Sequence, residues 1–88
     1  MKRKDRVVYT LDLCVKETTD AAIVAFLLRQ VLDDTQWILV SDATSAEPYQ
    51  FGIVCVGDKE VEKVKKVLTV LDDQEIYYVS SALPDEEE

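Results

Sequence analysis

The chain contains no histidine and no asparagine, and only two cysteines, two glycines and two prolines among its 88 residues. Without histidine, neither a Ser-His-Asp triad nor a Cys-His pair can form. Gly52 and Gly57 are too few for a phosphate-binding loop or a dinucleotide-binding fingerprint. The lack of both histidine and a Cys-x-x-Cys pair excludes an ordinary zinc site. These absences predict a protein that is not an enzyme and needs no metal or other cofactor.

Long apolar runs are missing too. No run reaches the roughly 18–20 residues that a membrane-spanning helix requires. The basic start, residues 1–6, leads into an alternating strand pattern and not into the apolar segment of a signal peptide. Cys14 and Cys55 are too few for a disulfide framework. We therefore expect a cytoplasmic protein that does not bind a membrane.

Bases are scarce relative to acids, at 10 against 18, and the formal net charge is −8. The middle of the chain is the most one-sided, since Arg29 is the only base between residues 17 and 58. The acids of that segment are Glu17, Asp20, Asp33, Asp34, Asp42, Glu47 and Asp58. Nucleic acids bind clusters of Lys and Arg, so this charge disfavours them as partners. It either keeps the protein soluble or attracts a protein with a basic rim.

The tetrapeptide Val-Leu-Asp-Asp occurs twice, at residues 31–34 and again at residues 70–73. Each copy ends a helical pattern, and a run of strand-forming residues begins two residues later. This spacing of 39 residues predicts that the chain is built from two similar halves, and it allows one half to be compared with the other.

The hydrophobic pattern divides the chain into six elements. Strict alternation predicts a half-buried first strand, helix-capping residues precede two periodic segments, and aromatic and β-branched runs predict three more strands. The six are a strand at 6–16, a helix at 21–34, strands at 37–41 and 49–56, a helix at 59–72 and a strand at 76–83. A polar loop, residues 42–48, joins the second strand to the third.

The order β-α-β-β-α-β predicts an α+β fold. Two β-α-β halves with right-handed crossovers would interleave into one four-stranded antiparallel sheet, with both helices on one face. This is the ferredoxin-like arrangement, with the expected strand order 4-1-3-2 and the first and third strands at the centre. We expect residues 1–84 to form this single domain and the acidic tail, residues 85–88, to be disordered.

The expected pairing of the two central strands makes a prediction about the cysteines. If these strands are centred on each other, Cys14 lies near Gln50 and Cys55 lies near Tyr9. The cysteines are then several residues apart along the sheet, so we expect two free thiols.

The two predicted helices differ in their outer faces when they are aligned by the 39-residue spacing. The second helix is amphipathic, and its charged face consists of Glu62, Lys63, Lys65 and Lys66. The aligned residues of the first helix are Ile23, Val24, Phe26 and Leu27. Either the first helix is rotated so that Ile23, Val24, Leu27 and Val31 face the sheet, or the register is kept and large apolar residues are exposed.

A protein-interaction module is the first functional hypothesis. If the register is kept, Ile23, Phe26 and Leu27 form an exposed patch of the kind that marks partner surfaces. Rotation still leaves Phe26 on the polar side of the helix. We therefore expect a regulatory module that docks a protein partner or a second copy, with Phe26 as the anchor and Asp33 and Asp34 at the rim. The partner would offer an apolar groove with a basic rim.

Two short motifs support a second hypothesis. Residues 51–56, Phe-Gly-Ile-Val-Cys-Val, resemble the third-strand signature of RNA-recognition motifs, and residues 8–13 resemble the first-strand signature of that family. The resemblance implies a single-stranded nucleic-acid binder that stacks bases on Tyr9, Phe51 and Ile53 of an open sheet face. Ile53 stands where the family has its second stacking aromatic, and the chain lacks the family's basic surround.

The layout of residues 7–83 supports a third hypothesis, because it is similar to that of ACT domains, which are small regulatory modules that bind amino acids and dimerise. Residues 68–79 have this family's passage from helix to last strand. The resemblance implies an amino-acid-sensing regulatory domain. The glycine that the family carries between its first strand and first helix is absent from residues 17–21.

Overall fold

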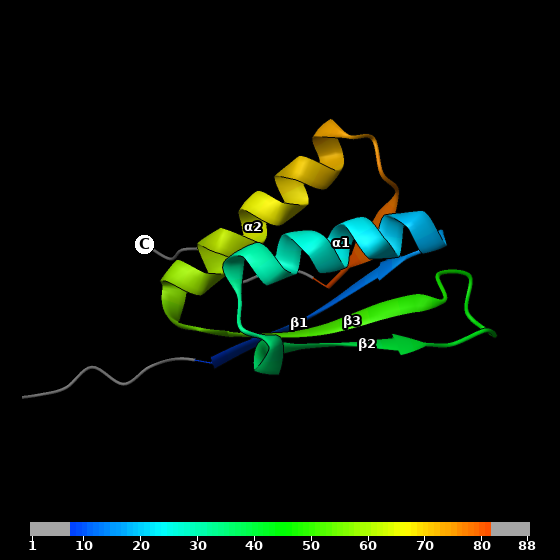
Figure 1. Cartoon of the computed structure of the whole chain (residues 1–88). Helices are drawn as coiled ribbons and strands as arrows, with labels where there is room; N and C mark the ends of the chain where they lie inside the picture. Colours follow the sequence, from blue (N-terminus) through cyan, green and yellow to red (C-terminus); the bar gives the residue numbers. More distant parts are fainter. Residues whose placement is uncertain (1–7, 82–88) are drawn as a thin grey trace, which may run out of the picture.

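The computed structural model describes residues 8–81, which form one four-stranded antiparallel sheet covered on one face by two helices (Figure 1). The elements are β1 Val8–Val15, α1 Thr18–Val31, a 3-10 turn Asp34–Gln36, β2 Trp37–Ser41, β3 Tyr49–Val56, α2 Gly57–Asp73 and β4 Tyr78–Ser80. The α+β class and the β-α-β-β-α-β order expected from the sequence are confirmed. The acidic tail expected to be disordered lies outside the described residues.

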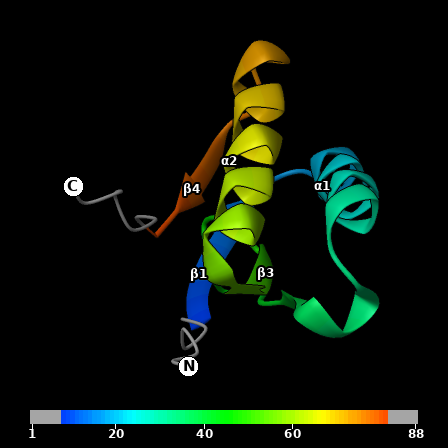
Figure 2. The ribbon, with the colours of Figure 1, turned by 90° about the vertical axis from the view of Figure 1, so that its left-hand side faces the viewer.

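The sheet has the strand order β2-β3-β1-β4. Counted from its other edge, the same row of neighbours reads 4-1-3-2, so β1 and β3 are central and β2 and β4 are edges. β1 pairs with β3 along its whole length, from Val8 opposite Val56 to Val15 opposite Tyr49. β4 pairs with β1 through three residues only. Figure 2 shows the two helices side by side, with β4 on the side of α2.

The register confirms the prediction for the cysteines. Cys14 lies opposite Gln50 and Tyr9 lies opposite Cys55. Both cysteines are free thiols. Alternation along β1 and β3 determines which residues share a face, and burial of one face makes a slip by one residue costly.

Four elements differ in extent from the expectation, of which β1 ends one residue earlier and α2 is longer by two residues at its start and one at its end. α1 begins at Thr18 because Glu17 has extended backbone and its carbonyl accepts from the Ala21 amide at 3.0 Å. α1 ends at Val31 because the chain then turns into the 3-10 segment. β4 begins two residues later than expected, since the Ile76 amide is used in a 2.9 Å bond to the Leu71 carbonyl and Glu75 has φ 61°. The far end of the expected last strand, residues 82–83, lies outside the described residues.

The core lies between the sheet and the helices. The strands contribute Leu11, Leu13, Val15, Phe51, Ile53 and Cys55, and the helices contribute Ala21, Val24, Leu28, Val61, Val64, Val67 and Leu71. Leu32, directly after α1, completes the set. All of these side chains are apolar, so the interior is held by hydrophobic burial, worth roughly 1.5–3 kcal/mol for each large side chain.

Candidate protein-interaction surface

The burial pattern of α1 shows how this helix is turned toward the core. Ala21 and Val24 are buried in α1 as Val61 and Val64 are in α2, at a spacing of 40 residues and not 39. One residue corresponds to about 100° of rotation about a helix axis. Rotation therefore explains the burial of Val24, but the expectation that it would also turn Ile23 toward the sheet is wrong.

The predicted site residues of α1 divide into two groups. Phe26 is 59% exposed, more than any other aromatic side chain in residues 8–81, and Ile23 is 38% exposed. Leu27 is only partly exposed, since it packs against the core. Asp33 and Asp34 are exposed at the end of α1, and the Asp33 backbone amide donates to Gln36 Oε1 at 3.0 Å. The patch therefore keeps two of its three apolar residues and both of its acids.

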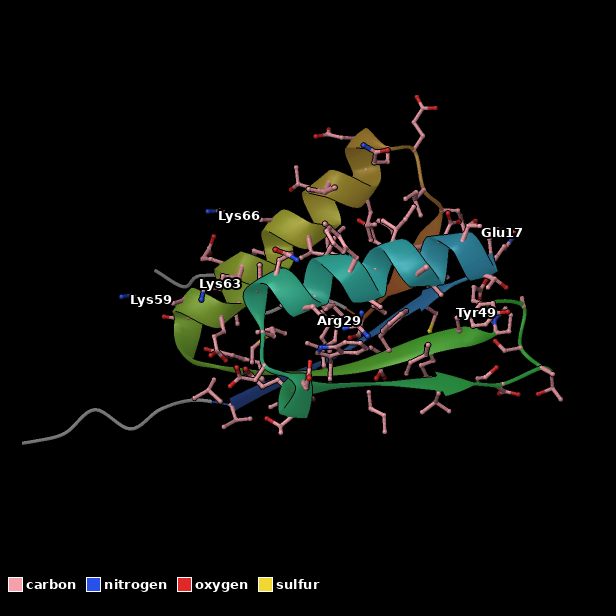
Figure 3. The ribbon with its side chains drawn as sticks, in the orientation of Figure 1. Glu17, Arg29, Tyr49, Lys59, Lys63 and Lys66 are labelled. Carbon is pink, nitrogen blue, oxygen red and sulfur yellow. The ribbon has the colours of Figure 1, made fainter. Side chains whose placement is uncertain are left out.

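Phe26 lies on the outer side of α1, nearly opposite the buried Val24 and Leu28 and about 60° around the helix from Arg29. Arg29, three residues later on the same helix face, holds its guanidinium 5.9 Å from the centre of the Trp37 ring in β2. Figure 3 shows Arg29 directed from α1 toward the sheet. Leu39 of β2 points to the helix side, since it pairs with the buried Phe51, and it is 42% exposed. Arg29 therefore lies between the exposed apolar residues of α1 and the exposed Leu39 of β2.

β2 is an edge strand with no obvious protection. Ile38, Leu39 and Val40 are consecutive and are 63%, 42% and 50% exposed. No other strand in residues 8–81 pairs with the outer side of β2. Proteins commonly protect such edges with lysine, proline, a bulge or a very short strand, and β2 has no lysine and no proline. We call Ile23, Phe26, Ile38, Leu39 and Val40 together the α1–β2 surface.

Acidic groups lie at both ends of β2, and the lysines lie elsewhere. Asp33 and Asp34 precede the strand, and Asp42 follows it. The Asp42 carboxylate accepts from the Thr44 hydroxyl at 2.7 Å and from the Thr44 amide, which lowers the pKa of Asp42 and keeps it ionised. The lysines Lys59, Lys63 and Lys66 point outward from α2 (Figure 3).

The three residues expected to stack bases do not lie on the open face of the sheet. Phe51 and Ile53 are 0% and 1% exposed beneath the helices. Tyr9 is on the same covered face, and its hydroxyl donates to Asp58 Oδ1 at 3.2 Å. Alternation put all three on the apolar side of β1 and β3, which the helices cover. Tyr9, Phe51 and Ile53 therefore do not form a nucleic-acid platform.

The open face of the sheet carries exposed apolar side chains among its polar ones, a feature that the sequence did not predict. The exposed apolar residues on it, apart from those of β2, are Val8, Val54, Tyr77 and Val79. Lys16 lies on this face with its ammonium 4.5 Å from the centre of the Tyr77 ring. Val8, Val54 and Val79 alternate along their strands with residues of the core. The alternation therefore predicts that these positions face solvent, where polar residues are the usual expectation.

Neither thiol has the features of a reactive centre. Burial, and then the nearby charges of Asp12 and Glu47, raise the pKa of Cys14, and burial followed by Glu60 raises the pKa of Cys55. A raised pKa lowers the thiolate fraction at neutral pH. Within residues 8–81, no group of three or more His, Cys, Asp or Glu side chains is placed to hold a metal ion.

A hollow of about 330 Å³ lies where β3 turns into α2. Its lining includes Asp58, Lys59, Glu60 and Lys63, so its charge is mixed. Glu60 Oε1 accepts from the Val56 amide at 2.7 Å and already neutralises the start of α2. This hollow therefore offers no preformed anion site.

Comparison with known proteins finds no matching family model, no matching curated protein and no matching solved structure. Among the helices of residues 8–81, none has the length and apolar character needed to cross a membrane.

Proposed function

We propose that the chain is a non-enzymatic protein-interaction module that binds a protein through the α1–β2 surface. The observation that carries this proposal is the 59% exposure of Phe26, together with the exposed apolar residues of the edge strand β2. Exposed apolar patches on otherwise charged proteins mark interaction sites, and aromatic side chains are frequent anchors in them. Asp33 and Asp34 give the site an acidic end, which suits a partner with a basic rim.

We also propose that the fold is of the ferredoxin-like type. The β-α-β-β-α-β order, the central position of β1 and β3, and the placement of both helices on one face support this assignment. Fold likeness alone does not indicate a function, so the interaction proposal rests on the α1–β2 surface and not on the fold.

The proposed function is tested by replacing Phe26. Phe26→Asp puts a charge in the middle of the apolar surface and is expected to weaken binding of a captured partner by at least about 30-fold, or roughly 2 kcal/mol. Affinity would be measured by calorimetry after a partner has been captured from a native lysate and purified.

Val70→Asp is the matched control, because Val70 is an exposed apolar helix residue that lies on α2, outside the proposed surface. We expect it to leave affinity unchanged. Equal affinities for Phe26→Asp and the unmodified chain would show that the binding site lies elsewhere.

A further inference from the structure

The partner that the α1–β2 surface fits best is a second copy of this chain. We infer that two copies join edge to edge through β2, so that the two sheets become one eight-stranded sheet. This inference rests on the proposed function, because it names the occupant of the same surface. Its first support is the unpaired outer side of β2, which offers backbone amides and carbonyls to another strand.

The sequence of β2 is self-complementary under a two-fold axis. If two β2 strands pair antiparallel with Leu39 opposite Leu39, then Ile38 lies opposite Val40 of the second copy and Trp37 lies opposite Ser41. The Ile38–Val40 pairs fall on the open face and the Leu39 pair falls on the helix side. Pairs of β-branched residues directly opposite each other are favourable in antiparallel sheets. A two-fold interface requires this kind of match of one surface with itself.

The area that edge pairing can bury is that of a weak dimer. At their exposed fractions, the five side chains of the α1–β2 surface present on the order of 450 Å² per copy, but they lie on both faces of the sheet, so edge pairing buries only part of it, below the roughly 1,000 Å² at which specific interfaces begin. The paired backbone adds to this area. The two Arg29 side chains, which lie over Trp37, would be the part of α1 closest to the axis.

Charge both supports and limits this dimer. Arg29, placed over Trp37, would lie near Ser41 and therefore near Asp42 of the second copy, and the axis repeats this pair. The same register sets Gln36 opposite Asp42 and brings Asp34 near it, so Arg29, the only base between residues 17 and 58, must offset a local repulsion between acids of the two copies. The net charge of −8 on each copy acts against association at long range.

The other edge of the sheet does not fit a second copy in the same way. β4 has three residues, and Ser81 beyond it donates its amide to the Asp12 carbonyl at 3.0 Å and accepts from the Asp12 amide through its hydroxyl. Stacking of two open sheet faces is the competing arrangement, because Val54, Tyr77 and Val79 are exposed there. Stacked faces would bury side chains of β4 as well as those of β2, whereas edge pairing would involve β2 alone. Substitutions in β4 and in β2 therefore distinguish the two arrangements.

Sedimentation velocity of the full chain over a dilution series tests for the dimer. We expect a dimer that strengthens as ionic strength rises from about 0.01 to 1 M, because salt screens the repulsion between two acidic copies. A basic foreign partner would instead bind more weakly in salt. A chain that stays monomeric at every concentration and ionic strength overturns this inference, and it leaves the proposed function to its own test with a foreign partner.

Two matched substitutions identify the surface that is used. Val40 and Val79 are β-branched residues on opposite edge strands and the same open face, and they are 50% and 44% exposed. Val40→Lys is expected to weaken the dimer by at least about tenfold, since lysine on an edge strand blocks pairing. Val79→Lys should leave it unchanged. Equal losses of dimer affinity in the two variants would indicate that the open sheet faces stack. No loss in either variant would show that the sheet takes no part in the dimer. Both outcomes overturn the inference.

A charge exchange tests the register. Arg29→Glu and Asp42→Arg should each weaken self-association, and a mixture of the two variants should recover it, because the mixed dimer restores opposite charges at both contacts. A mixture no stronger than either variant alone overturns pairing about Leu39.

Hydrogen exchange at high dilution tests whether the outer edge of β2 is free in the monomer. If the outward-facing β2 amides are protected as well as those paired with β3, the chain covers its own edge, and this outcome also overturns the inference.

Discussion

At the scale of single residues, Glu60 joins three parts of the chain. Its Oε1 accepts from the Val56 amide at the end of β3 and from Gln36 Nε2, each at 2.7 Å. Gln36 also donates to the Val54 carbonyl at 3.2 Å and accepts from the Asp33 amide. The start of α2 is thereby tied to β3 and to the turn that leads into β2. The sequence contains no motif that predicts this network, because Gln36 and Glu60 are far apart along the chain.

Removing this carboxylate should destabilise the fold. Glu60→Ala leaves the Val56 amide without its acceptor and removes one of the two acceptors of Gln36 Nε2, at a cost of about 1–3 kcal/mol. Thermal unfolding should then shift down by roughly 4–8 °C per kcal/mol. Glu62→Ala is the control, because Glu62 makes a 3.8 Å surface contact with Lys65 that is worth at most about 1 kcal/mol. Similar midpoints for both variants would contradict the structural role of Glu60.

At the scale of elements, α1 is the part where the two halves of the chain differ most. α2 buries Val61, Val64, Val67 and Leu71 along one stripe. α1 contributes an alanine, Ala21, at the place that corresponds to Val61, and it leaves Phe26 in solvent. The first helix therefore has less apolar contact with the core than the second, and it has apolar area left for a partner.

The rotation of α1 can be checked by stability measurements. Leu28→Ala is expected to cost about 2–5 kcal/mol, because Leu28 is fully buried and its loss leaves a cavity. Phe26→Ala should change stability by no more than about 0.5 kcal/mol in the monomer, since Phe26 is largely exposed. Urea unfolding at a concentration where the chain is monomeric gives both values. A larger loss for Phe26→Ala would contradict the burial pattern of α1.

The register of the central strands could be predicted from the sequence, whereas the exposure of β2 could not, because only the first depends on alternation within the strands. Cys14 pairs with Gln50 as expected because strict alternation in two central strands leaves one register that buries the apolar side. The apolar run of β2 is typical of a strand buried on both faces, yet β2 lies at an edge, and hydrophobicity alone does not distinguish the two. Phe26 was found because it breaks the amphipathic pattern of its helix. Leu39 was missed because its exposure depends on where α1 ends and how it is turned.

At the scale of the whole molecule, titration should weaken the fold at both ends of the pH range. Hydrogen bonds from Thr44 lower the pKa of Asp42, so its contribution is present above its unfolded value and is lost as pH falls. Burial raises the pKa values of Cys14 and Cys55 from 9.0, and of Tyr78 from 10.0. For these three groups, the folded state holds its proton more tightly than the unfolded state.

Stability should therefore be constant near neutral pH and fall once the pH rises above about 9, where unfolded thiols ionise and folded thiols do not. Urea unfolding measured between neutral and alkaline pH would show this slope. Cys55→Ala should reduce the slope, whatever its effect on stability at pH 7. The same alkaline slope in Cys55→Ala and in the unmodified chain would show that the Cys55 thiol is not responsible.

The central position of β1 has a consequence for the order of events during synthesis. β1 is synthesised before both of its partners, β3 and β4, and it pairs with β4 across more than 60 residues of chain. Contacts between residues so distant in sequence form slowly, because the intervening chain must first be closed into a loop. Until Ser80 has emerged, one side of β1 has no strand beside it and the apolar β2 is already exposed. During that interval, growing chains on neighbouring ribosomes are expected to be prone to aggregate with one another through these unpaired strands.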